Sequence, residues 1–513
     1  MIISRTGARK WVNRHETFTQ NIEDLYDLAD ESTMDILADY NDVTAGIQQL
    51  MKQFIANGKR TRVLGGEWSW TKIAASDGIL LNTKPLNLTF RISLNNVSSA
   101  YAKSPDDLYF AQCGVSIQEL STRLRRRKRS LKTSGASNGQ TIAGALSTGT
   151  HGSAIDIGGV ADYVVGLHLI VSPTRHIWLE RRSYPVVSDA FVANLHAERV
   201  QDDALFNAAL VSFGCFGFIH GVMIETVPLF LYESYRLSVP MDNTLYTLME
   251  SLSFANSFLP YGSERPYHFQ VLVNQYDPNH KAYVTVMYKR DYEDNYIPPS
   301  MAVPGIGPGD DAPSFIGTIS QALPAVVPIL VNAVIGGSYK PYSKVFGTHA
   351  EMFSNTDLHG KVLSAAIGIP LSALNQVREL LIDLNTHYGP FAGVLAFRFV
   401  KGTQATLGFT HFTITCVVEL DSVMSDETYR FYNKVWDELE RQHIPHSFHW
   451  GKVLRLDHTR IRNMYGEEKI DNWIQARNTL MQDPESMRLF TNEVMVLWGL
   501  DEIRSTTPVT PVV

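Results

Sequence analysis

Residues 133–154, which read TSGASNGQTIAGALSTGTHGSA, form the densest tract of glycine and hydroxyl side chains in the chain. Its five glycines allow the backbone to approach a ligand closely, and its hydroxyl and backbone N–H groups suit phosphate oxygens. A flexible surface loop is the alternative, but a solvated linker has no use for the apolar residues Ile142 and Leu146. The tract therefore predicts a fold in which an apolar framework holds a backbone cradle for a phosphate-bearing ligand.

Two further glycine-rich segments have the same character. GGEWSW, at residues 65–70, follows the apolar strand Arg62 to Leu64, and SFGCFGFIHGV covers residues 212–222. No strand in the chain leads into Gly-x-Gly-x-x-Gly with an acidic residue about twenty positions later, which is the pattern of a Rossmann nucleotide site. The three segments therefore favour a phosphate-binding framework other than the Rossmann fold.

Helices and strands alternate in the first part of the chain. Residues 41–57 repeat apolar side chains at helical spacing, and short buried strands are expected at 78–82 and 108–115. Residues 116–124 predict a second helix that begins at a serine cap. This succession of strand, glycine turn and helix is what a mixed α and β framework requires.

The length and a change of texture indicate more than one domain. A chain of 513 residues and 57.5 kDa exceeds what one ordinary core organises. Beyond about residue 230 the sequence turns to strands rich in Tyr, Phe and Val, at 267–273 and 282–288, between long loops. We therefore expect the first domain boundary near residue 230.

The charge balance excludes general nucleic-acid binding. The chain has 45 basic and 52 acidic residues, a net charge of -7. A local exception is the basic run Arg123 to Arg129, which we interpret as the solvated end of a surface helix. Docking to an anionic partner or to a membrane surface is the alternative interpretation of this run.

The cysteines and the N-terminus bear on the compartment. Cys113, Cys215 and Cys416 lie far apart in apolar runs, without metal-site spacing, and indicate reduced core residues in a reducing compartment. The N-terminal residues contain no apolar core segment and no small-residue cleavage site, so a secretory signal is not expected. The cytoplasm is therefore the predicted location.

The stretch 313–337, PSFIGTISQALPAVVPILVNAVIGG, carries no charge, but prolines and scattered polar residues interrupt it. No apolar run within it is long enough to span a bilayer. We interpret it as a buried or half-buried helix pair in a cap domain. The alternative is a lid or docking surface for a lipophilic substrate, because a large exposed apolar patch usually marks an interaction site.

The segments GGEWSW, QTIAGALSTGTHG and SFGCFGFIHGV, in this order, resemble the FAD-binding domain of the vanillyl-alcohol oxidase flavoprotein family, the PCMH type. His449-Trp450-Gly451-Lys452 is similar to the C-terminal His-Trp-x-Lys motif of the alditol and sugar-lactone oxidase branch. The resemblance implies an α+β fold with a two-part FAD-binding domain at 1–230. It also implies a substrate or cap domain at 231–445, with an antiparallel sheet covered by helices, and a C-terminal segment at 446–513 that returns to the FAD-binding domain.

The resemblance implies FAD as the cofactor. A buried pyrophosphate needs many aligned donors and close approach of the backbone, and the family supplies them from the first two loops. Carried over to this sequence, the implied cofactor-binding residues are Gly65, Gly66, Trp68, Ser69, Trp70, Ser147, Thr148, Gly149, His151 and Gly152, with Val222 near the adenine end and His449 in the C-terminal motif.

Trp68 stands where family members commonly have the histidine of a Gly-x-Gly-His-Ser sequence. That histidine forms a covalent bond to the methyl group on the benzenoid ring of the flavin, whereas an indole nitrogen is a poor nucleophile. FAD is therefore expected to bind without a covalent bond through this loop. Glu67, in place of the second glycine, restricts the backbone and adds a negative charge near the pyrophosphate.

Alcohol oxidation by a flavin needs a base for the hydroxyl proton and positive charge for the developing alkoxide. In the alditol and lactone branch, a Glu-x-Arg pair on a central strand and the lysine of His-Trp-x-Lys supply them. This sequence keeps the arginine as Arg398 and the lysine as Lys452, but has Ala396 at the glutamate position. The following strand, 409–413, resembles one that carries an active-site histidine and would present His411.

Each of these assignments has a structural alternative. For Arg398, which lies between two phenylalanines, it is a structural salt bridge. For His411 it is a core histidine with satisfied ring nitrogens, and for His449 it is a residue that orients its turn. Because alanine cannot accept a hydrogen bond, Ala396 predicts weak binding of sugar alcohols and sugar lactones, and favours a larger and less polar alcohol.

The leading hypothesis is an FAD-dependent oxidoreductase acting on a CH–OH group without a metal, with Arg398 and Lys452 polarising the oxygen and His411 as base. The alternatives are a flavin-dependent desaturase or oxidative cyclase of secondary metabolism, a flavin-binding protein without turnover, and a binding module without flavin. The expected partners are a small-molecule alcohol and an electron acceptor, either oxygen or another molecule, and no nucleic acid. Membrane contact is an alternative, and the oligomeric state is left open.

Overall fold

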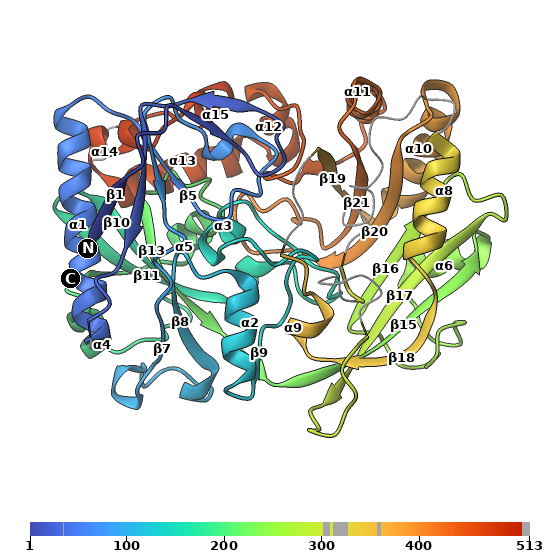
Figure 1. Cartoon of the computed structure of the whole chain (residues 1–513), viewed down its shortest axis with the longest axis horizontal. Helices are drawn as coiled ribbons and strands as arrows, with labels where there is room; N and C mark the ends of the chain where they lie inside the picture. Colours follow the sequence, from blue (N-terminus) through green and yellow to red (C-terminus); the bar gives the residue numbers. More distant parts are fainter. Residues whose placement is uncertain (34, 301–307, 311–326, 357–360, 505–513) are drawn as a thin grey trace.

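The computed structural model describes residues 1–33, 35–300, 308–310, 327–356 and 361–504. The chain forms two halves that lie side by side, one built from the N-terminal elements and the C-terminal helices, the other from the strands between residues 230 and 448 (Figure 1). Both halves mix helices and sheets, so the α+β class expected from the sequence is confirmed.

Two sheets organise the first half. The four-stranded sheet, whose last three strands are parallel, has the order β1 (Ile2–Arg5), β4 (Asp24–Ala29), β6 (Ile79–Asn82), β5 (Thr61–Leu64). The six-stranded sheet, antiparallel except for its first pair, has the order β12 (Glu198–Gln201), β11 (Arg175–Glu180), β10 (Val164–Ser172), β13 (Phe218–Glu225), β8 (Leu108–Gln112), β7 (Thr89–Arg91). Two short pairs complete this half: β2 (Lys10–Val12) with β3 (Thr19–Asn21), and β9 (Arg129–Ser130) with β14 (Val227–Pro228).

The helices of the first half follow the predicted periodicity. α1 (Ile36–Ala56) begins earlier than the apolar pattern predicted, because the side chain of Asp35 accepts hydrogen bonds from the backbone at Leu37 and Ala38. α2 (Ile117–Arg125) begins at Ser116, which forms a capping box with Glu119 as the sequence predicted a serine cap. The remaining helices of this half are α3 (Ile142–Ser147), α4 (Asp189–Asn194) and α5 (Asp203–Leu210).

An eight-stranded sheet organises the second half. Its order is β18 (Tyr342–Gly347), β15 (Phe230–Pro240), β17 (Lys281–Asp291), β16 (His268–Val273), β20 (Gly393–Lys401), β21 (Ile414–Val423), β19 (Val362–Pro370), β22 (Ser447–Phe448), and all neighbours are antiparallel. Its helices are α6 (Asn243–Ser251), α8 (Val327–Ser338), α9 (His349–Met352), α10 (Leu374–Tyr388) and α11 (Asp426–Arg441).

The alternation along β20 and β21 divides side chains between the two faces of this sheet. Phe397 and Phe399 join the main hydrophobic core, together with Leu420 of β21. α11 packs on this side, where the Tyr432 hydroxyl donates to the carbonyl of Leu420 at 2.6 Å. The residues in alternate positions, including Arg398, face the other side, which is therefore free to carry polar chemistry.

The C-terminal helices return to the first half, as Figure 1 shows. α13 (Glu467–Met481) contacts α5, and α14 (Pro484–Leu489) contacts α1. The Trp473 indole, on α13, donates to the carbonyl of Val211 at 3.0 Å. The two other helices of this segment are α12 (His458–Tyr465) and α15 (Glu493–Leu497). The proposed domain boundaries near residues 230 and 445 stay predictions.

The uncharged stretch 313–337 is described only from residue 327 on, and its first part lies outside the described residues. α8, which covers most of the rest, packs Val331 and Ile335 into an apolar cluster with Leu272 and Val394, while Ile329 is 67% exposed. α8 is therefore a half-buried helix, and the prediction of a second helix falls on residues outside the described part of the chain. Nowhere in the described chain is a helix both long and apolar enough to cross a membrane.

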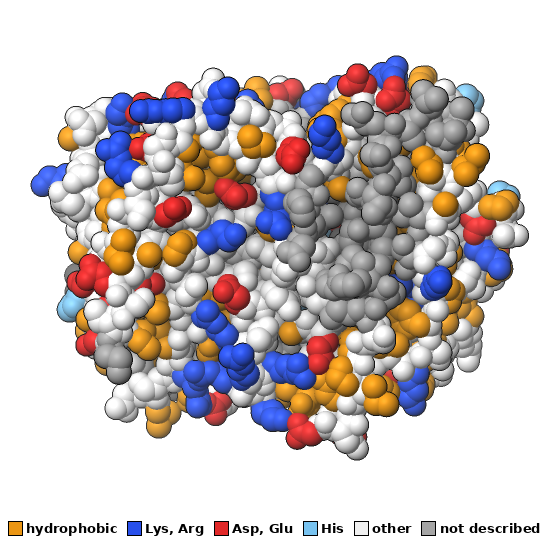
Figure 2. Space-filling view, in the orientation of Figure 1, with side chains coloured by type: hydrophobic (Ala, Val, Ile, Leu, Met, Phe, Trp, Pro, Cys, Tyr) orange, Lys and Arg blue, Asp and Glu red, His pale blue; other side chains and the backbone are white. Residues whose placement is uncertain are grey.

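The basic run 123–129 ends α2 and lies where Figure 2 shows a group of Lys and Arg side chains at the lower edge of the molecule. Several of its charges are paired: Arg125 with Glu351 at 2.9 Å, and Lys128 with Asp294 at 2.7 Å. Such pairing fits the interpretation as the end of a surface helix. The three cysteines are buried and form no disulfide.

Candidate active site

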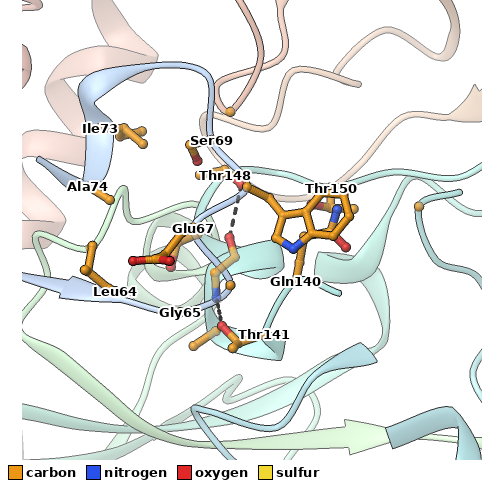
Figure 3. Close-up of a pocket in the computed structure, with 18 of the residues that line it drawn as sticks. Leu64, Gly65, Glu67, Ser69, Ile73, Ala74, Gln140, Thr141, Thr148 and Thr150 are labelled. Carbon is orange, nitrogen blue, oxygen red and sulfur yellow. Dashed lines mark hydrogen bonds between the residues drawn. The ribbon is translucent and has the colours of Figure 1, made fainter. Parts of the chain in front are cut away.

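A deep cavity lies between the two halves of the molecule and is lined by all three glycine-rich loops and by the inner face of the eight-stranded sheet. The space among its lining atoms is about 1440 Å³ when its open mouth is included. Figure 3 shows Gly65, Glu67 and Ser69 of the first loop on one side, close to Gln140 and Thr148 of the second. The cavity is therefore built from segments far apart in the sequence.

The first two loops approach each other backbone to backbone. A Cβ atom at Gly65 would lie 2.1 Å from the Thr141 hydroxyl oxygen, and one at Gly66 would lie 2.6 Å from the carbonyl oxygen of Gly139. Glycine is therefore required at both positions by packing. Of the predicted binding residues in the first loop, the structure places all five in the cavity lining: Gly65, Gly66, Trp68, Ser69 and Trp70.

The structure shows the backbone conformation of Glu67 and the partner of its carboxylate, which the sequence alone did not indicate. Its φ of +63° is in the left-handed region that glycine adopts easily, so this residue holds a strained conformation. The carboxylate accepts a hydrogen bond from the Trp11 indole at 2.7 Å. This bond provides a partner for the carboxylate and compensates part of the strain.

Trp68 is 7% exposed and fills the position predicted for a covalently attached residue. The Arg14 guanidinium lies over its ring, 4.7 Å from the centroid, and Gly139 is so close that a Cβ there would lie 2.5 Å from the indole. Next to it, Trp70 stacks on His15 with 3.9 Å between ring centroids. The first loop therefore presents an aromatic wall that is fixed by packing.

The second loop contributes a short helix and its C-terminal turn. Thr141 caps α3 by accepting a hydrogen bond from the backbone of Gly144 at 3.3 Å. Ser147, Thr148 and His151 line the cavity as predicted. Gly149 and Gly152 were predicted to do so as well, but they are not in its lining.

The third loop lines the cavity with residues other than the one predicted. Val222 was expected to touch the adenine end of the cofactor, but it lies in the middle of β13, paired with Ala111 of β8 and Leu167 of β10, and is not in the cavity lining. Gly217 and Ile219 of the same loop line the cavity instead. A shift of a few residues along a loop that becomes a strand accounts for the error.

The His-Trp-Gly-Lys turn joins the C-terminal segment to the first loop. The backbone N–H of Trp70 donates to the carbonyl of Gly451 at 2.8 Å. The backbone N–H of Gly451 in turn donates to Nδ1 of His449 at 3.0 Å, so a neutral ring carries its proton on Nε2. His449 therefore orients the turn and also lines the cavity, and the turn presents Lys452 to the interior.

A charged cluster occupies the end of the cavity next to the sheet. Glu419 on β21 lies between two cations: Nζ of Lys452 is 2.5 Å from its Oε1, and Nε of Arg398 is 2.7 Å from its Oε2. The His151 Nε2 is 3.8 Å from Oε1. The Glu419 side chain is 2% exposed, so the predicted pair Arg398 and Lys452 is brought together by a buried carboxylate that the sequence analysis did not identify.

The strand register explains the position of Glu419. Ala396 on β20 pairs directly with Glu419 on β21, so the two side chains share a face and a position. The carboxylate expected at residue 396 is therefore supplied by the facing residue, and the small alanine leaves room for it. The sequence analysis placed Ala396 at the glutamate position and did not identify Glu419 as a carboxylate of the site. The signal that could have revealed it was a glutamate in the buried strand TCVVELDSV, but the residue that faces this glutamate depends on the strand register.

Burial and charge act in opposite directions on the acidic pair of β21. Burial raises the pKa of Glu419, but the charges of Arg398 and Lys452 lower it more, so the carboxyl is ionised. Asp421, two residues further on the same strand, accepts a hydrogen bond from the Ser364 hydroxyl at 2.6 Å. Its burial, and next the negative charge of Glu419, raise its pKa to about 6. The two carboxyls therefore hold different protonation states in mildly acidic solution.

The two histidines of the site are neutral. Burial lowers the pKa of His151 to about 3, and burial lowers that of His449 well below its ordinary value. Neither histidine adds positive charge near neutral pH, so the cations of this cluster are Arg398 and Lys452.

The structure does not bring His411 to the cavity. Residues 409–413 form a loop, not the predicted strand, because β21 begins only at Ile414. The His411 ring contacts Phe412 and Tyr465 and is not part of the cavity lining. Burial lowers its pKa to about 4. We therefore do not retain His411 as the base.

The cavity residues fit the dinucleotide that the sequence predicts. Side chains in the lining carry buried polar atoms without a hydrogen-bond partner among the described residues: Trp68 Nε1, Gln140 Oε1 and Arg62 Nε. Unsatisfied buried polar atoms are rare in folded proteins and often mark the position of a missing ligand group. Together with the glycine and hydroxyl residues of the loops, they are the donors and acceptors that a long phosphate-bearing ligand needs.

Comparison with known proteins points in the same direction. A family model described as an FAD binding domain matches residues 42–178. The chain is 22% identical over 455 residues to L-gulono-1,4-lactone dehydrogenase of Mycobacterium tuberculosis, covering 88% of this chain and 92% of that one. A long-chain alcohol oxidase from an uncultured marine euryarchaeote is 35% identical over 114 residues, 22% of this chain and 21% of its own. In fold, the chain is similar to cholesterol oxidase from Brevibacterium sterolicum, with a TM-score of 0.70, 15% identity and 97% of each chain covered.

Proposed function

Since the chain belongs to the flavoproteins with this FAD-binding domain and is related to the sugar-lactone oxidases and dehydrogenases, we propose that it oxidises the CH–OH group of an alcohol larger and less polar than a sugar alcohol. The chain is an FAD-dependent oxidoreductase, and the proposal extends this activity to a class of substrate. The observation that carries the proposal is the buried cluster of Arg398, Glu419 and Lys452 in the cavity wall.

The cluster has the charges that alcohol oxidation requires. When bound, FAD supplies the hydride acceptor. Arg398 and Lys452 place positive charge where the substrate oxygen becomes negative, and their burial strengthens that effect. Glu419 is then the base: proton transfer from the hydroxyl moves the negative charge from the carboxylate to the substrate oxygen beside the same two cations. Because the charge of the cluster does not change, the low pKa of Glu419 does not prevent the transfer.

Two observations support an apolar substrate. Each oxygen of Glu419 already contacts one cation, so the carboxylate can accept from the one hydroxyl that reacts but not from the several hydroxyls of a polyol. Beyond Ala396 the same face of the sheet becomes apolar, at Leu272 and Val394 under α8. The similarity of part of the chain to a long-chain alcohol oxidase favours the same class. The near full-length similarity to a lactone dehydrogenase favours a sugar lactone as the second candidate.

A substrate panel tests this proposal. The oxidised flavin is mixed without oxygen with long-chain primary alcohols, a sterol, L-gulono-1,4-lactone and xylitol, and the loss of its visible absorbance is followed. We expect the apolar alcohols to bleach the flavin at least about tenfold faster than xylitol. The apolar face beside the cluster offers no hydrogen-bond partners for the additional hydroxyls of xylitol. Faster bleaching by the lactone would transfer the proposal to the second candidate. Bleaching by no alcohol would favour the desaturase or the protein without turnover.

Admission of air to the bleached protein then separates the possible electron acceptors. Return of the absorbance within seconds would identify oxygen, whereas slow return would indicate another acceptor.

FAD is proposed to be bound without a covalent bond, because Trp68 offers no nucleophile at the usual attachment position. We expect the yellow chromophore to leave with the supernatant when the purified protein is precipitated with acid. The control is the total absorbance of the protein dissolved in denaturant before precipitation. Colour retained in the pellet would mean that another residue attaches the flavin and would overturn this proposal.

A further inference from the structure

Arg62, on β5 just before the first loop, is a buried cation in the cavity lining with 2% exposure. Its guanidinium is held by backbone carbonyls, with Nη1 donating to Gly214 at 3.2 Å and to Phe490 at 2.7 Å, and Nη2 donating to Ile73 at 2.5 Å and to Phe213. No carboxylate pairs with it in the described part of the chain, and its Nε has no acceptor there. A buried charge without a counter-ion is costly, so its presence calls for an explanation.

Arg477, on α13, contacts the third glycine-rich loop and is 0% exposed. Its Nε donates to the carbonyl of Cys215 at 3.2 Å, and its Nη2 donates to the carbonyl of Met487 and to the Thr491 hydroxyl, both at 3.0 Å. Within the described residues it too lacks a carboxylate partner, and its Nη1 has no acceptor. The two positive charges are close enough to affect each other: burial lowers the pKa of Arg62 to about 10, and Arg477 contributes to this decrease.

The other charged side chains of the cavity each have a polar partner. Arg398 and Lys452 share Glu419, and Glu67 accepts a hydrogen bond from Trp11. Among the described residues of the lining, Arg62 is therefore the cation that forms no ion pair with a carboxylate. A pyrophosphate carries the negative charge that this end of the cavity lacks. In addition, the arginines draw the carbonyl oxygens of the third loop toward themselves and away from any bound phosphate.

We propose that Arg62, with Arg477 behind it, holds the FAD pyrophosphate through its positive charge across the third loop. The two are positioning residues for the cofactor and take no part in the chemistry of the substrate. The inference rests on FAD binding and not on the identity of the alcohol, so failure of the substrate panel would leave it standing.

Variants that keep or remove the charge test the proposal. Arg62→Lys keeps the charge but loses most of the hydrogen bonds to carbonyls, whereas Arg62→Gln loses the charge and keeps one or two donors. FAD release from the holoprotein is followed by the rise of flavin fluorescence on dilution, at NaCl concentrations from about 0.05 to 1 M. We expect Arg62→Gln to bind FAD about 10- to 100-fold more weakly than Arg62→Lys, as removal of a unit charge at partly screened range implies. Release from the wild type should become faster with salt, and this dependence should be weaker in Arg62→Gln.

Arg477→Lys and Arg477→Gln form a second pair that does not touch the cavity, in case the first pair does not fold. Arg477→Gln should bind FAD more weakly than Arg477→Lys, and the difference in affinity should be smaller than that between the two Arg62 variants. Arg430→Gln, an exposed arginine on α11, is the matched control and should release FAD like the wild type. Equal release from the Lys and Gln variants, with the salt dependence of the wild type, would mean that the arginines only brace the loop, and the proposal would be wrong.

Discussion

Glu419→Gln is expected to reduce the rate of flavin reduction by alcohol about 10²- to 10⁴-fold, the usual contribution of a general base. The amide keeps the size of the side chain but cannot take the hydroxyl proton. It also leaves Arg398 and Lys452 without a counter-ion, and they then repel each other. The measurement is the single-turnover bleaching rate without oxygen, at saturating substrate, with the FAD content of each preparation determined beforehand.

Asp421→Asn is the matched control for this prediction. Asp421 is a buried carboxyl two residues away on the same strand, but it is not in the cavity lining. We expect its replacement to slow flavin reduction less than about tenfold, because a residue outside the cavity acts on the substrate only through Glu419. A large loss in Asp421→Asn with a small one in Glu419→Gln would reverse the roles of the two carboxyls.

Moving the carboxylate across the strand pair is a sharper test. Positions 396 and 419 face each other, and directly opposed residues of antiparallel strands have Cβ atoms ~5 Å apart. The double variant Ala396→Glu with Glu419→Ala should therefore recover about tenfold or more of the rate lost in Glu419→Ala alone. Absence of any recovery, with FAD still bound, would mean that Glu419 acts through something other than the position of its carboxylate.

Mild acid is expected to destabilise the protein strongly. Six histidines are buried, and burial holds the pKa of each far below the ordinary value of 6.5: His151, His168, His220, His268, His349 and His449. A lowered pKa in the folded state means that the unfolded chain binds these protons first. Stability is therefore fully present above pH 6.5 and is lost as the pH falls below it, by about 1.4 kcal/mol per histidine and pH unit.

The six histidines together correspond to a loss of roughly 8 kcal/mol for each pH unit below 6, comparable with the whole net stability of a typical domain. Asp421 acts in the opposite direction, because its pKa is raised and the folded state binds its proton first. The stability that Asp421 gains as the pH falls is about equal to the stability that one histidine loses. The predicted outcome is a fall of the urea midpoint between pH 7.5 and 5.5.

Single histidine variants identify the source of this loss. His220 accepts or donates hydrogen bonds with Thr44 and Gln112 inside the first half, and His220→Gln should reduce the pH dependence by about one proton. His349→Gln serves the same purpose if that variant does not fold. His387→Gln replaces an exposed histidine of α10 and should leave the dependence unchanged. A urea midpoint that does not change between pH 7.5 and 5.5 would contradict the prediction.

The cofactor loops could be predicted from the sequence because their chemistry is local. Gly65 and Gly66 are needed where two backbones touch, and the hydroxyl residues around Thr148 line the same cavity, so the composition of a few residues was sufficient to identify these loops. The cap on α2 at Ser116 was likewise a local pattern. Val222 marks the limit of this reasoning, because the point where a loop becomes a strand depends on pairing with β8 and β10.

The charged cluster of the cavity depends on contacts that no local sequence pattern contains. Arg398 and Lys452 were predicted individually, from a strand and a turn, but the carboxylate between them was not. His411 was placed on a strand that the chain does not form. Glu419 was missed because side chains on a strand alternate with a period of two, and only the register with β20 decides which residue faces Ala396.

By itself, then, the sequence determined the cofactor class and the loops that line the cavity, since close approach of a backbone to a ligand requires short runs of glycine and hydroxyl residues. The tertiary structure alone decided which charges meet. Arg398, Glu419 and Lys452 come from β20, β21 and the C-terminal turn, and the free energy that favours their contact appears only when strands distant in sequence pair in one register.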